Sequence, residues 1–334
     1  MVSLKDIANA TGYSLSTVSI VLRGIGKERG IPESTQEKVL EVAKAMDYQP
    51  NVSARRLRSD VPLKRGIAVF WADDFRVVMV AKFLQGAQQY IKERTANLEV
   101  VICPYEPGHL FTAATIPVLN MYAGAIICTA SKEDMAYVDS LDVNSPIVVY
   151  NRESEKYPCV GVDNEEIGVI AARKLLSDGC KNMLFISDNS DQFYLASRCS
   201  GFIKECERAN MSVKTIFVNN NTIQMGKDCG ARLEVGTEKT GVFTGSDYIA
   251  MGLLCGLVDR GVKIPEQVEV ISTGTSDIDI YQCLRPSLSI VEVPLEKMAY
   301  QCARMLHAII NHEVLSEREV NLPFRLCLGN STLG

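Results

Sequence analysis

The sequence predicts an α/β protein, with an N-terminal all-α helix-turn-helix head and a larger core of two doubly wound parallel-sheet subdomains. Residues 4–22 have the pattern of two short helices around a tight turn. From about residue 64 onward, short apolar runs alternate with amphipathic stretches, as in strands connected by helices. This second part of the 334-residue chain is too long for one sheet of ordinary size, so two similar subdomains are expected.

The head is predicted from helix start and stop signals. A first helix begins at Leu4, with Ser3 placed to cap it. Gly12 tolerates the left-handed backbone that ends a helix, and Ser14 can cap a second helix that ends at Gly24. In a helix-turn-helix, the second helix enters the major groove of DNA. A third helix is expected from Glu33 to Met46, with the apolar set Val39, Leu40, Val42, Ala43 and Met46.

The core is predicted from its alternating pattern. Strands are expected at Gly66–Trp71, Leu98–Cys103, Ala123–Cys128, Pro146–Tyr150, Met183–Ser187, Lys214–Val218, Gly241–Thr244 and Val268–Ser272. Helices are expected at Val80–Arg94, Glu166–Asp178, Ser197–Ala209 and Tyr248–Arg260. Sheets of this kind carry helices on both faces and bind ligands at the carboxyl ends of their strands, so a ligand cleft is expected there.

Composition and charge fit a globular protein with a basic head. The apolar fraction is 47% and the charged fraction 22%. Residues 1–65 contain eleven Lys and Arg against seven Asp and Glu, a formal charge of +4, which leaves −9 for the rest of the chain. The eleven cysteines are scattered singly, which favours reduced thiols in a cytoplasm. Neither a long apolar run nor a secretion signal is apparent.

Two motifs near the N-terminus resemble those of the lactose-repressor (LacI) family. For the pattern D-I-A-x-x-A-G-x-S-x-x-T-V-S, the matching residues are Asp6, Ile7, Ala8, Gly12, Ser14, Thr17, Val18 and Ser19, and the second alanine falls at Thr11. The pattern Y-x-P-N-x-x-A-R-x-L matches at every fixed position from Tyr48 to Leu57. Both motifs stand in order at the start of the chain, and the resemblance continues with gaps to the C-terminus.

The resemblance implies a periplasmic-binding-protein-like core whose chain crosses three times between the subdomains. It places the DNA-binding head at residues 1–49, the hinge at 50–60, and the effector-binding and dimerisation core at 61–334. The first subdomain would hold about residues 64–160 and 295–327, and the second about 161–290 and 328–334. The last crossing is expected near Ser289–Pro294, before a long helix at Leu295–Ile310 and a final strand near Phe324–Leu328.

The resemblance also implies which head residues contact DNA. Leu15, Ser16 and Ile20 match the positions that read bases. Ser16 can hydrogen-bond to any base, whereas Leu15 and Ile20 can contact only apolar features such as a thymine methyl group. The complete implied set in the head is Ser3, Ser14, Leu15, Ser16, Thr17, Ser19 and Ile20. The alternative is that these are ordinary exposed or half-buried helix residues.

The implied hinge is a short helix capped by Asn51. Its DNA-binding set is Asn51, Ser53, Ala54, Arg55, Leu57 and Arg58. Leu57 matches the family's wedge, which enters the minor groove between base pairs and kinks the duplex. A helix this short does not persist alone in water, so we expect it to order only on DNA, when a dimer holds two hinges together. A solvated linker is the alternative for this arginine-rich run.

Three segments resemble the family's ligand-binding loops and place a small-molecule effector, a sugar or sugar derivative, between the subdomains. Arg198 is the foremost candidate, because a guanidinium group can bind two hydroxyls or a carboxylate at once. The complete set is Trp71, Asp73, Phe75, Asn151, Asp163, Arg198, Ser246 and Thr275. Asn151 and the segment Thr273–Thr275 stand where the family commonly has acidic residues. For Trp71, packing in the core is the alternative.

Two other classes of protein are weaker alternatives. A doubly wound α/β enzyme would be expected to carry a G-x-G-x-x-G, G-x-S-x-G or Walker motif, and the sequence has none. A non-DNA-binding periplasmic-type sugar-binding protein would have a secretion signal and no head. We therefore expect a cytoplasmic, homodimeric regulator of the repressor type. Its expected partners are a pseudo-palindromic double-stranded DNA operator and a small-molecule effector, without cofactor, metal or membrane contact.

Overall fold

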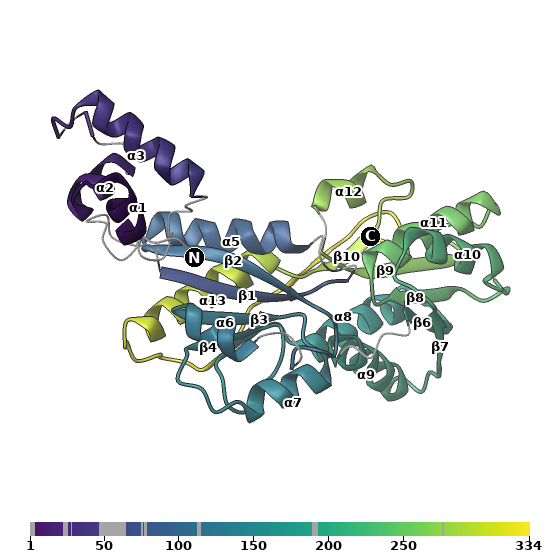
Figure 1. Cartoon of the computed structure of the whole chain (residues 1–334). Coiled ribbons are helices and arrows are strands. Elements are labelled where there is room, and N and C mark those ends of the chain that lie inside the picture. Colours follow the sequence, from purple (N-terminus) through teal and green to yellow (C-terminus); the bar gives the residue numbers. More distant parts are fainter. Residues whose placement is uncertain are drawn as a thin grey trace. The chain divides into compact units, whose positions relative to one another are not determined.

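The computed structural model describes residues 4–22, 26–27, 29–46, 65–74, 76, 79–111, 115–188, 193–275 and 277–334. The chain forms two compact units, Met1–Leu63 and Lys64–Gly334 (Figure 1). The described part of the first unit is helical, whereas the second unit holds two six-stranded sheets. This confirms the predicted fold class.

The head consists of α1 (Leu4–Thr11), α2 (Leu15–Leu22) and α3 (Glu33–Ala45). Its small core contains Ile7, Ala8, Val18, Val21, Val39 and Ala43. One residue of the predicted apolar set is not part of that core: the Leu40 side chain is 52% exposed. Because α3 is packed on one face only, the apolar residue on its opposite face stays in solvent.

The first sheet of the second unit has the strand order β11-β5-β4-β3-β1-β2, and all its pairs are parallel. Its strands are β1 (Arg65–Ala72), β2 (Leu98–Tyr105), β3 (Gly124–Cys128), β4 (Ile147–Tyr150), β5 (Cys159–Gly161) and β11 (Glu319–Asn321). Successive residues of β1 face opposite sides of the sheet. Val69 packs toward α5 (Val80–Glu93) and α13 (Leu295–Ile310). Phe70 packs toward α6 (Thr115–Met121) and α7 (Lys132–Ser140).

The second sheet has the order β12-β10-β9-β8-β6-β7 and is parallel except for β12 against β10. Its strands are β6 (Asn182–Asp188), β7 (Val213–Val218), β8 (Thr240–Thr244), β9 (Val268–Gly274), β10 (Ser289–Glu292) and β12 (Arg325–Cys327). Phe243 packs toward α8 (Asn164–Ser177) and α9 (Phe193–Arg208). The opposite face is covered by α10 (Ile223–Arg232), α11 (Asp247–Asp259) and α12 (Ile278–Cys283).

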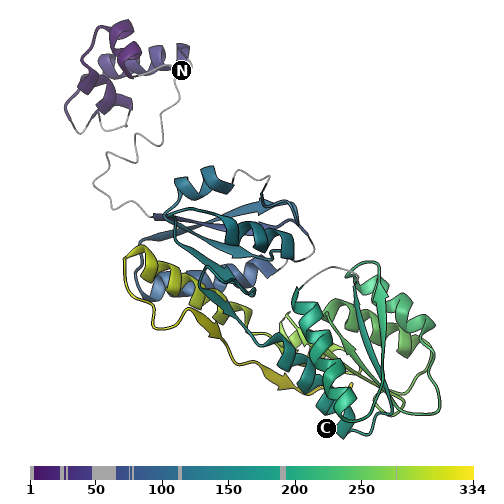
Figure 2. The same cartoon turned by 90° about the horizontal axis from the view of Figure 1, so that it is seen from below.

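The chain passes three times between the two sheets (Figure 2). The crossing expected to be last, near Ser289–Pro294, is the second, and the last lies between Asn321 and Arg325. The expectation that residues up to 327 belong to the first subdomain was therefore wrong. β12 pairs antiparallel with β10, and an ion pair between Arg325 and Glu292 joins the two strands.

Side-chain caps set the starts of several helices. Ser131 and Asp134 form a reciprocal capping box at α7. Asp163 caps α8, and Ser246 caps α11. At α8 and α11, a polar residue just beyond a strand satisfies the free amides of the helix that follows. The same local chemistry that starts these two helices also places polar side chains at the carboxyl ends of the strands.

Candidate functional site

The start of α2 has the features of a DNA-reading helix. Gly12 has a φ of +76°, as predicted for the turn between α1 and α2. The backbone amide of Thr17 donates to the hydroxyl of Ser14 (3.1 Å), so Ser14 caps α2 as expected. Val18 is buried toward α1 and α3, which leaves Leu15, 45% exposed, and Ser16 on the outer surface. Both side chains are exposed, and the Ser16 hydroxyl is hydrogen-bonded to that of Ser14 at 2.9 Å.

The other predicted DNA contacts fall into two groups. Thr17, Ser19 and Ile20 are half-buried on α2, so they present less surface than Leu15 and Ser16. Ser3 and the hinge residues lie outside the described residues. The latter are Asn51, Ser53, Ala54, Arg55, Leu57 and Arg58.

A cavity of about 50 Å³ lies between the two sheets of the core, at the carboxyl ends of their strands. It brings together five of the predicted effector residues: Trp71, Asn151, Arg198, Ser246 and Thr275. Asp73 is exposed and does not line this cavity. Asp163 accepts from the amide of Glu166 (2.9 Å) as the cap of α8 and lines a neighbouring cavity instead. Phe75 lies outside the described residues.

Arg198 projects from α9 and is 3% exposed. Its Nε donates to Oδ1 of Asn164 at 3.0 Å, and its Nη1 to the hydroxyl of Thr273 at 3.4 Å. These contacts tie the guanidinium group to the first residue of α8 and to β9. The side chain is therefore held in a fixed orientation at the wall of the cavity.

Asp247 organises the opposite wall and was missed by the sequence analysis. Its Oδ2 accepts from the amide and the hydroxyl of Thr275, both at 3.1 Å, and from the phenol of Tyr281 at 2.5 Å. Ser246 is hydrogen-bonded to Oδ1 of Asn221 at 2.6 Å. The position of Asp247 in the first turn of a helix that follows a strand was the signal that could have identified it.

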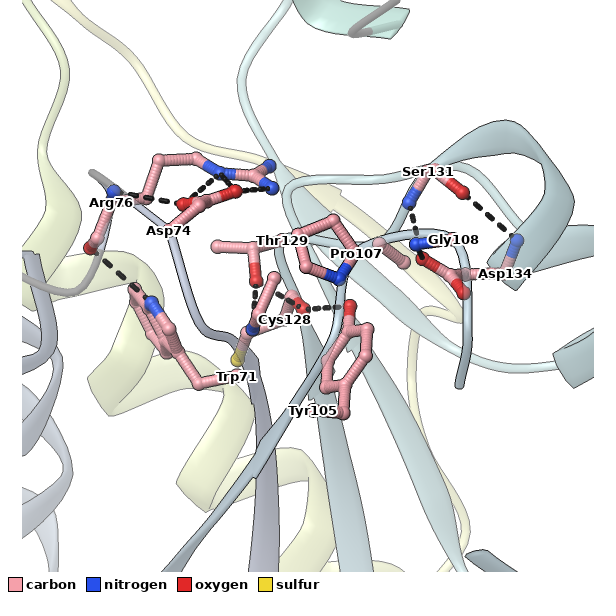
Figure 3. A network of polar contacts seen from close by, with 12 residues as sticks. Trp71, Asp74, Arg76, Tyr105, Pro107, Gly108, Cys128, Thr129, Ser131 and Asp134 are labelled. Atoms are coloured by element: carbon pink, nitrogen blue, oxygen red, sulfur yellow. Dashed lines mark hydrogen bonds and ion pairs between the residues drawn. The ribbon is translucent and has the colours of Figure 1, made fainter. Parts of the chain in front are cut away.

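Trp71 is both a core residue and a cavity residue. Its ring packs against Phe83 (5.6 Å between centroids) and Tyr150 (6.2 Å). Its Nε1 donates to the carbonyl of Arg76 at 3.2 Å. The Arg76 guanidinium group in turn donates to both carboxylate oxygens of Asp74 (Figure 3). Burial raises the pKa of Tyr150 well above its usual range, so its phenol stays protonated and donates to the carbonyl of Leu295. The sequence analysis did not single out Arg76.

Asn151 and Arg152 directly follow β4 and also line the cavity. Asn151 has a φ of +53°, a conformation that asparagine adopts more readily than most residues. Its Oδ1 is buried and has no hydrogen-bond partner among the described residues. Arg152 donates from Nε to the carbonyl of Ala130 and from Nη1 to that of Asn151, both at 2.6 Å.

The described residues set limits on other kinds of site. They contain no group of three His, Cys, Asp or Glu side chains placed to hold a metal ion. Within the same described ranges, no helix is long and apolar enough to cross a membrane.

Comparison with known proteins assigns both units. Residues 3–51 match the bacterial regulatory proteins of the lacI family, and residues 172–332 match a periplasmic binding protein-like domain. Catabolite control protein A of Priestia megaterium is 25% identical and is aligned over 99% of each chain. A LacI family transcription regulator from Clostridium acetobutylicum is 30% identical, with a TM-score of 0.73 over 79% of this chain and 99% of its own.

A further solved structure shares the fold at lower identity. The lac repressor dimer bound to operator and the anti-inducer ONPF is 17% identical, with a TM-score of 0.72 over 100% of this chain and 99% of its own. The two matched segments and the Clostridium acetobutylicum relative confirm the resemblance seen in the N-terminal motifs. The chain belongs to the lacI family of bacterial regulatory proteins and is a DNA-binding transcriptional regulator.

Proposed function

We propose that this regulator is a cytoplasmic homodimer that represses transcription by binding a pseudo-palindromic operator, and that an effector in the cavity between the sheets controls its operator affinity. The observation that carries the proposal is the capped start of α2, where Leu15 and Ser16 are exposed within the segment that matches the lacI family. The lac repressor was solved as a dimer on its operator. A two-fold symmetric dimer presents two such helices to two half-sites.

We assign separate roles to three consecutive segments of the chain. Residues 1–49 read the major groove, residues 50–60 form the hinge, and residues 61–334 bind effector and dimerise. In the hinge, Leu57 enters the minor groove as a wedge, while Arg55 and Arg58 contact the phosphate backbone of the DNA. Asn51, Ser53 and Ala54 complete the hinge contacts, and Ser3, Ser14, Thr17, Ser19 and Ile20 those of the head.

Control by effector is proposed from the position of the cavity. Its walls come from both sheets, with Trp71 and Asn151 on one side and Arg198, Ser246 and Thr275 on the other. A ligand that binds one relative orientation of the subdomains better shifts the population toward that orientation. The orientation in turn sets the spacing of the two hinges in a dimer, and thereby operator affinity.

The proposal includes the absence of enzymatic activity. The polar groups around the cavity are engaged in holding loops and helix starts, as with Asp247 on Thr275 and Tyr281. Three named relatives and neighbours are a control protein, a transcription regulator and a repressor. A fixed, polar, two-walled cavity suits recognition of a ligand.

The test is a selection of genomic DNA fragments by the purified full-length protein, followed by footprinting at moderate salt. We expect a pseudo-palindrome with a flexible pyrimidine–purine step at its centre, protected by a dimer. The selection is repeated with pooled sugars and sugar derivatives, because some effectors promote operator binding. If neither selection enriches a symmetric sequence, the proposed mode of DNA recognition is wrong.

A further inference from the structure

The segment between α2 and α3 contains a closed turn that carries basic side chains. The amide of Ile31 donates to the carbonyl of Gly26 at 2.9 Å, and the amide of Gly30 donates to the carbonyl of Lys27 at 3.2 Å. Gly30 has a φ of +69°, a conformation that glycine adopts without strain. Two hydrogen bonds therefore close the chain on itself between residues 26 and 31.

This turn is fixed to the rest of the head. Nε2 of Gln36 on α3 donates to the carbonyl of Ile31 at 2.7 Å, and the Ile31 side chain packs against the core of the head. Gly26 is buried, and a Cβ atom built there would be 2.6 Å from Cδ of Gln36. The turn thus lies directly on the side chain of Gln36 and is held to α3 at both of its ends.

Lys27 and Arg29 are exposed on this turn. No described residue forms an ion pair or a hydrogen bond with either side chain. Lys38, by contrast, lies over the ring of Tyr13, with its Nζ 5.5 Å from the ring centroid. Glu28, which stands between the two cations in the sequence, lies outside the described residues. Because the turn is already folded, an anion that binds Lys27 and Arg29 does not have to order the backbone that carries them.

The turn follows the helix that is expected to read the major groove. α2 has eight residues, and a helix rises 1.5 Å per residue, so α2 is about 12 Å long. The major groove is also about 12 Å wide, and the phosphate backbones form its edges. When the exposed start of α2 meets the base edges, its other end lies near an edge of the groove. Only three residues separate Leu22 from Gly26, so the turn stays near that end of α2.

We propose that Lys27 and Arg29 bind phosphate groups of the DNA backbone at the edge of each half-site and hold α2 in the groove. The inference rests on the proposed mode of DNA recognition and adds two contacts to those assigned to the head. Phosphate contacts fix the register and orientation of a protein on the duplex without reading its sequence. The turn should therefore add affinity for any duplex and leave the preference for the operator unchanged.

The salt dependence of DNA binding tests the proposal. The full-length protein and the double variant Lys27→Gln/Arg29→Gln are titrated by fluorescence anisotropy against a duplex of random sequence at several salt concentrations. Each phosphate contact contributes about 0.9 to the slope of log K against log salt concentration. The slope should therefore fall by about 1.8 for each head on the DNA, and by about 3.6 for a dimer with both heads bound.

A matched control separates contact from overall charge. Lys181→Gln/Arg232→Gln removes the same two kinds of cation from exposed positions of the second subdomain, so its slope should remain that of the wild type. Thermal melting followed by circular dichroism checks that both double variants are folded, as expected for changes of exposed side chains. Equal slopes for the two double variants would overturn the proposal.

A second measurement locates the contacts. Single phosphates of the selected operator are replaced by uncharged methylphosphonates, and the affinity of each modified duplex is measured. The wild type should lose affinity at phosphates that border the half-sites, and Lys27→Gln/Arg29→Gln should lose no more affinity at those positions. If both proteins respond alike at every phosphate, Lys27 and Arg29 contact none of them and the proposal is rejected.

The outcome is separable from that of the proposed function. If a symmetric operator is selected and the slope of Lys27→Gln/Arg29→Gln equals that of the control, the regulator stands and only the phosphate contacts of the turn are rejected. If no symmetric operator is selected but the slope falls as expected, the turn contacts DNA without the proposed mode of recognition.

Discussion

Gly168 of α8 lies directly against the backbone of Arg198 on α9. A Cβ atom built at Gly168 would be 2.0 Å from the Arg198 carbonyl oxygen, and one built at Gly201 would be 2.0 Å from the Glu165 carbonyl oxygen. The two glycines thus allow the helices to approach backbone to backbone. This close approach also sets the distance over which Arg198 reaches Asn164 at the start of α8.

Replacing Gly168 by alanine should therefore cost stability and disturb the cavity together. The methyl group must push the two helices apart, because backbone atoms cannot turn aside as a side chain can, and overpacking of this kind costs about 1–3 kcal/mol. Chemical denaturation measures the free energy of unfolding. Gly236→Ala is the matched control, since a Cβ there meets nothing within 4 Å. Equal stability of the two variants would contradict the close-packing argument.

The long helices and the head could be predicted because their signals are local. The helix predicted at Leu295–Ile310 has those bounds in the structure, and Ser14 caps α2 as expected. β5 and β11 were not predicted. Each has three residues, too few for a periodic pattern, and each is defined by pairing with a distant segment.

The residues of the cavity were predictable only where a local sequence signal marks them. Arg198 and Ser246 lie within segments that resemble the family's ligand-binding loops, so the sequence points to them. Asp247 could have been found from its place at the start of a helix that follows a strand, but its partners Thr275 and Tyr281 are distant in the sequence. Arg76 lies in a loop without a recognised motif, where its carbonyl accepts from the Trp71 indole. The assignment of β12 to the wrong subdomain has a similar origin, because strand pairing and not composition decides which sheet receives it.

Arg198→Ala should abolish the response to effector while leaving operator binding without effector unchanged. The side chain contacts Asn164 and Thr273 inside the second subdomain, whereas the residues expected to read DNA belong to the other compact unit of the chain. Operator affinity is measured by fluorescence anisotropy with and without effector. A variant that still responds fully would show that Arg198 is not part of the binding site.

Leu57→Ala should weaken specific operator binding and reduce DNA bending while sparing non-specific binding. A smaller side chain cannot open a base step, whereas phosphate contacts by arginines are independent of sequence. Bending is measured by energy transfer between the ends of a labelled operator. Leu40→Ala, at an exposed position of α3, is the control. An unchanged bend angle in Leu57→Ala would exclude the wedge role.

Asp277→Asn should make ligand exchange faster. The Lys82 ammonium group on α5 lies 3.1 Å from both Asp277 and Glu296. Burial lowers the pKa of Lys82, but the two carboxylates together outweigh burial and raise this pKa above its ordinary value. The contact with Asp277 joins the two subdomains, whereas that with Glu296 stays within the first. An exposed pair contributes at most about 1 kcal/mol, so dissociation measured by Trp71 fluorescence should accelerate at most a few-fold. Glu296→Gln is the matched control. An equal acceleration of ligand dissociation in Glu296→Gln would contradict the idea that the contact of Asp277 with Lys82 holds the two subdomains together around the ligand.

A buried carboxyl group in the second subdomain should make stability depend on pH. Glu269 on β9 is 0% exposed, and its Oε1 accepts from Lys239 at 2.5 Å and from the amide of Leu333 at 3.1 Å. Burial raises the pKa of Glu269 above its ordinary value of 4.5, and the neighbouring carboxyl group of Asp178 raises it further. Lys239 and the Leu333 amide oppose this shift, and Lys174 pairs with Asp178 on the adjoining helix.

Because its pKa is raised, Glu269 holds a proton more firmly in the folded protein than in the unfolded chain. Its contribution to stability is therefore fully present below pH 4.5 and is lost as the pH rises through the raised value. Glu269→Gln removes this titration. The melting temperature of the variant relative to that of the wild type should therefore increase steadily as the pH rises from 4.5 to the raised pKa of Glu269. Glu99→Gln, the same substitution at an exposed position of β2, is the control. A pH-independent difference for Glu269→Gln would mean that Glu269 keeps its charge when the protein folds, with Lys239 compensating its burial.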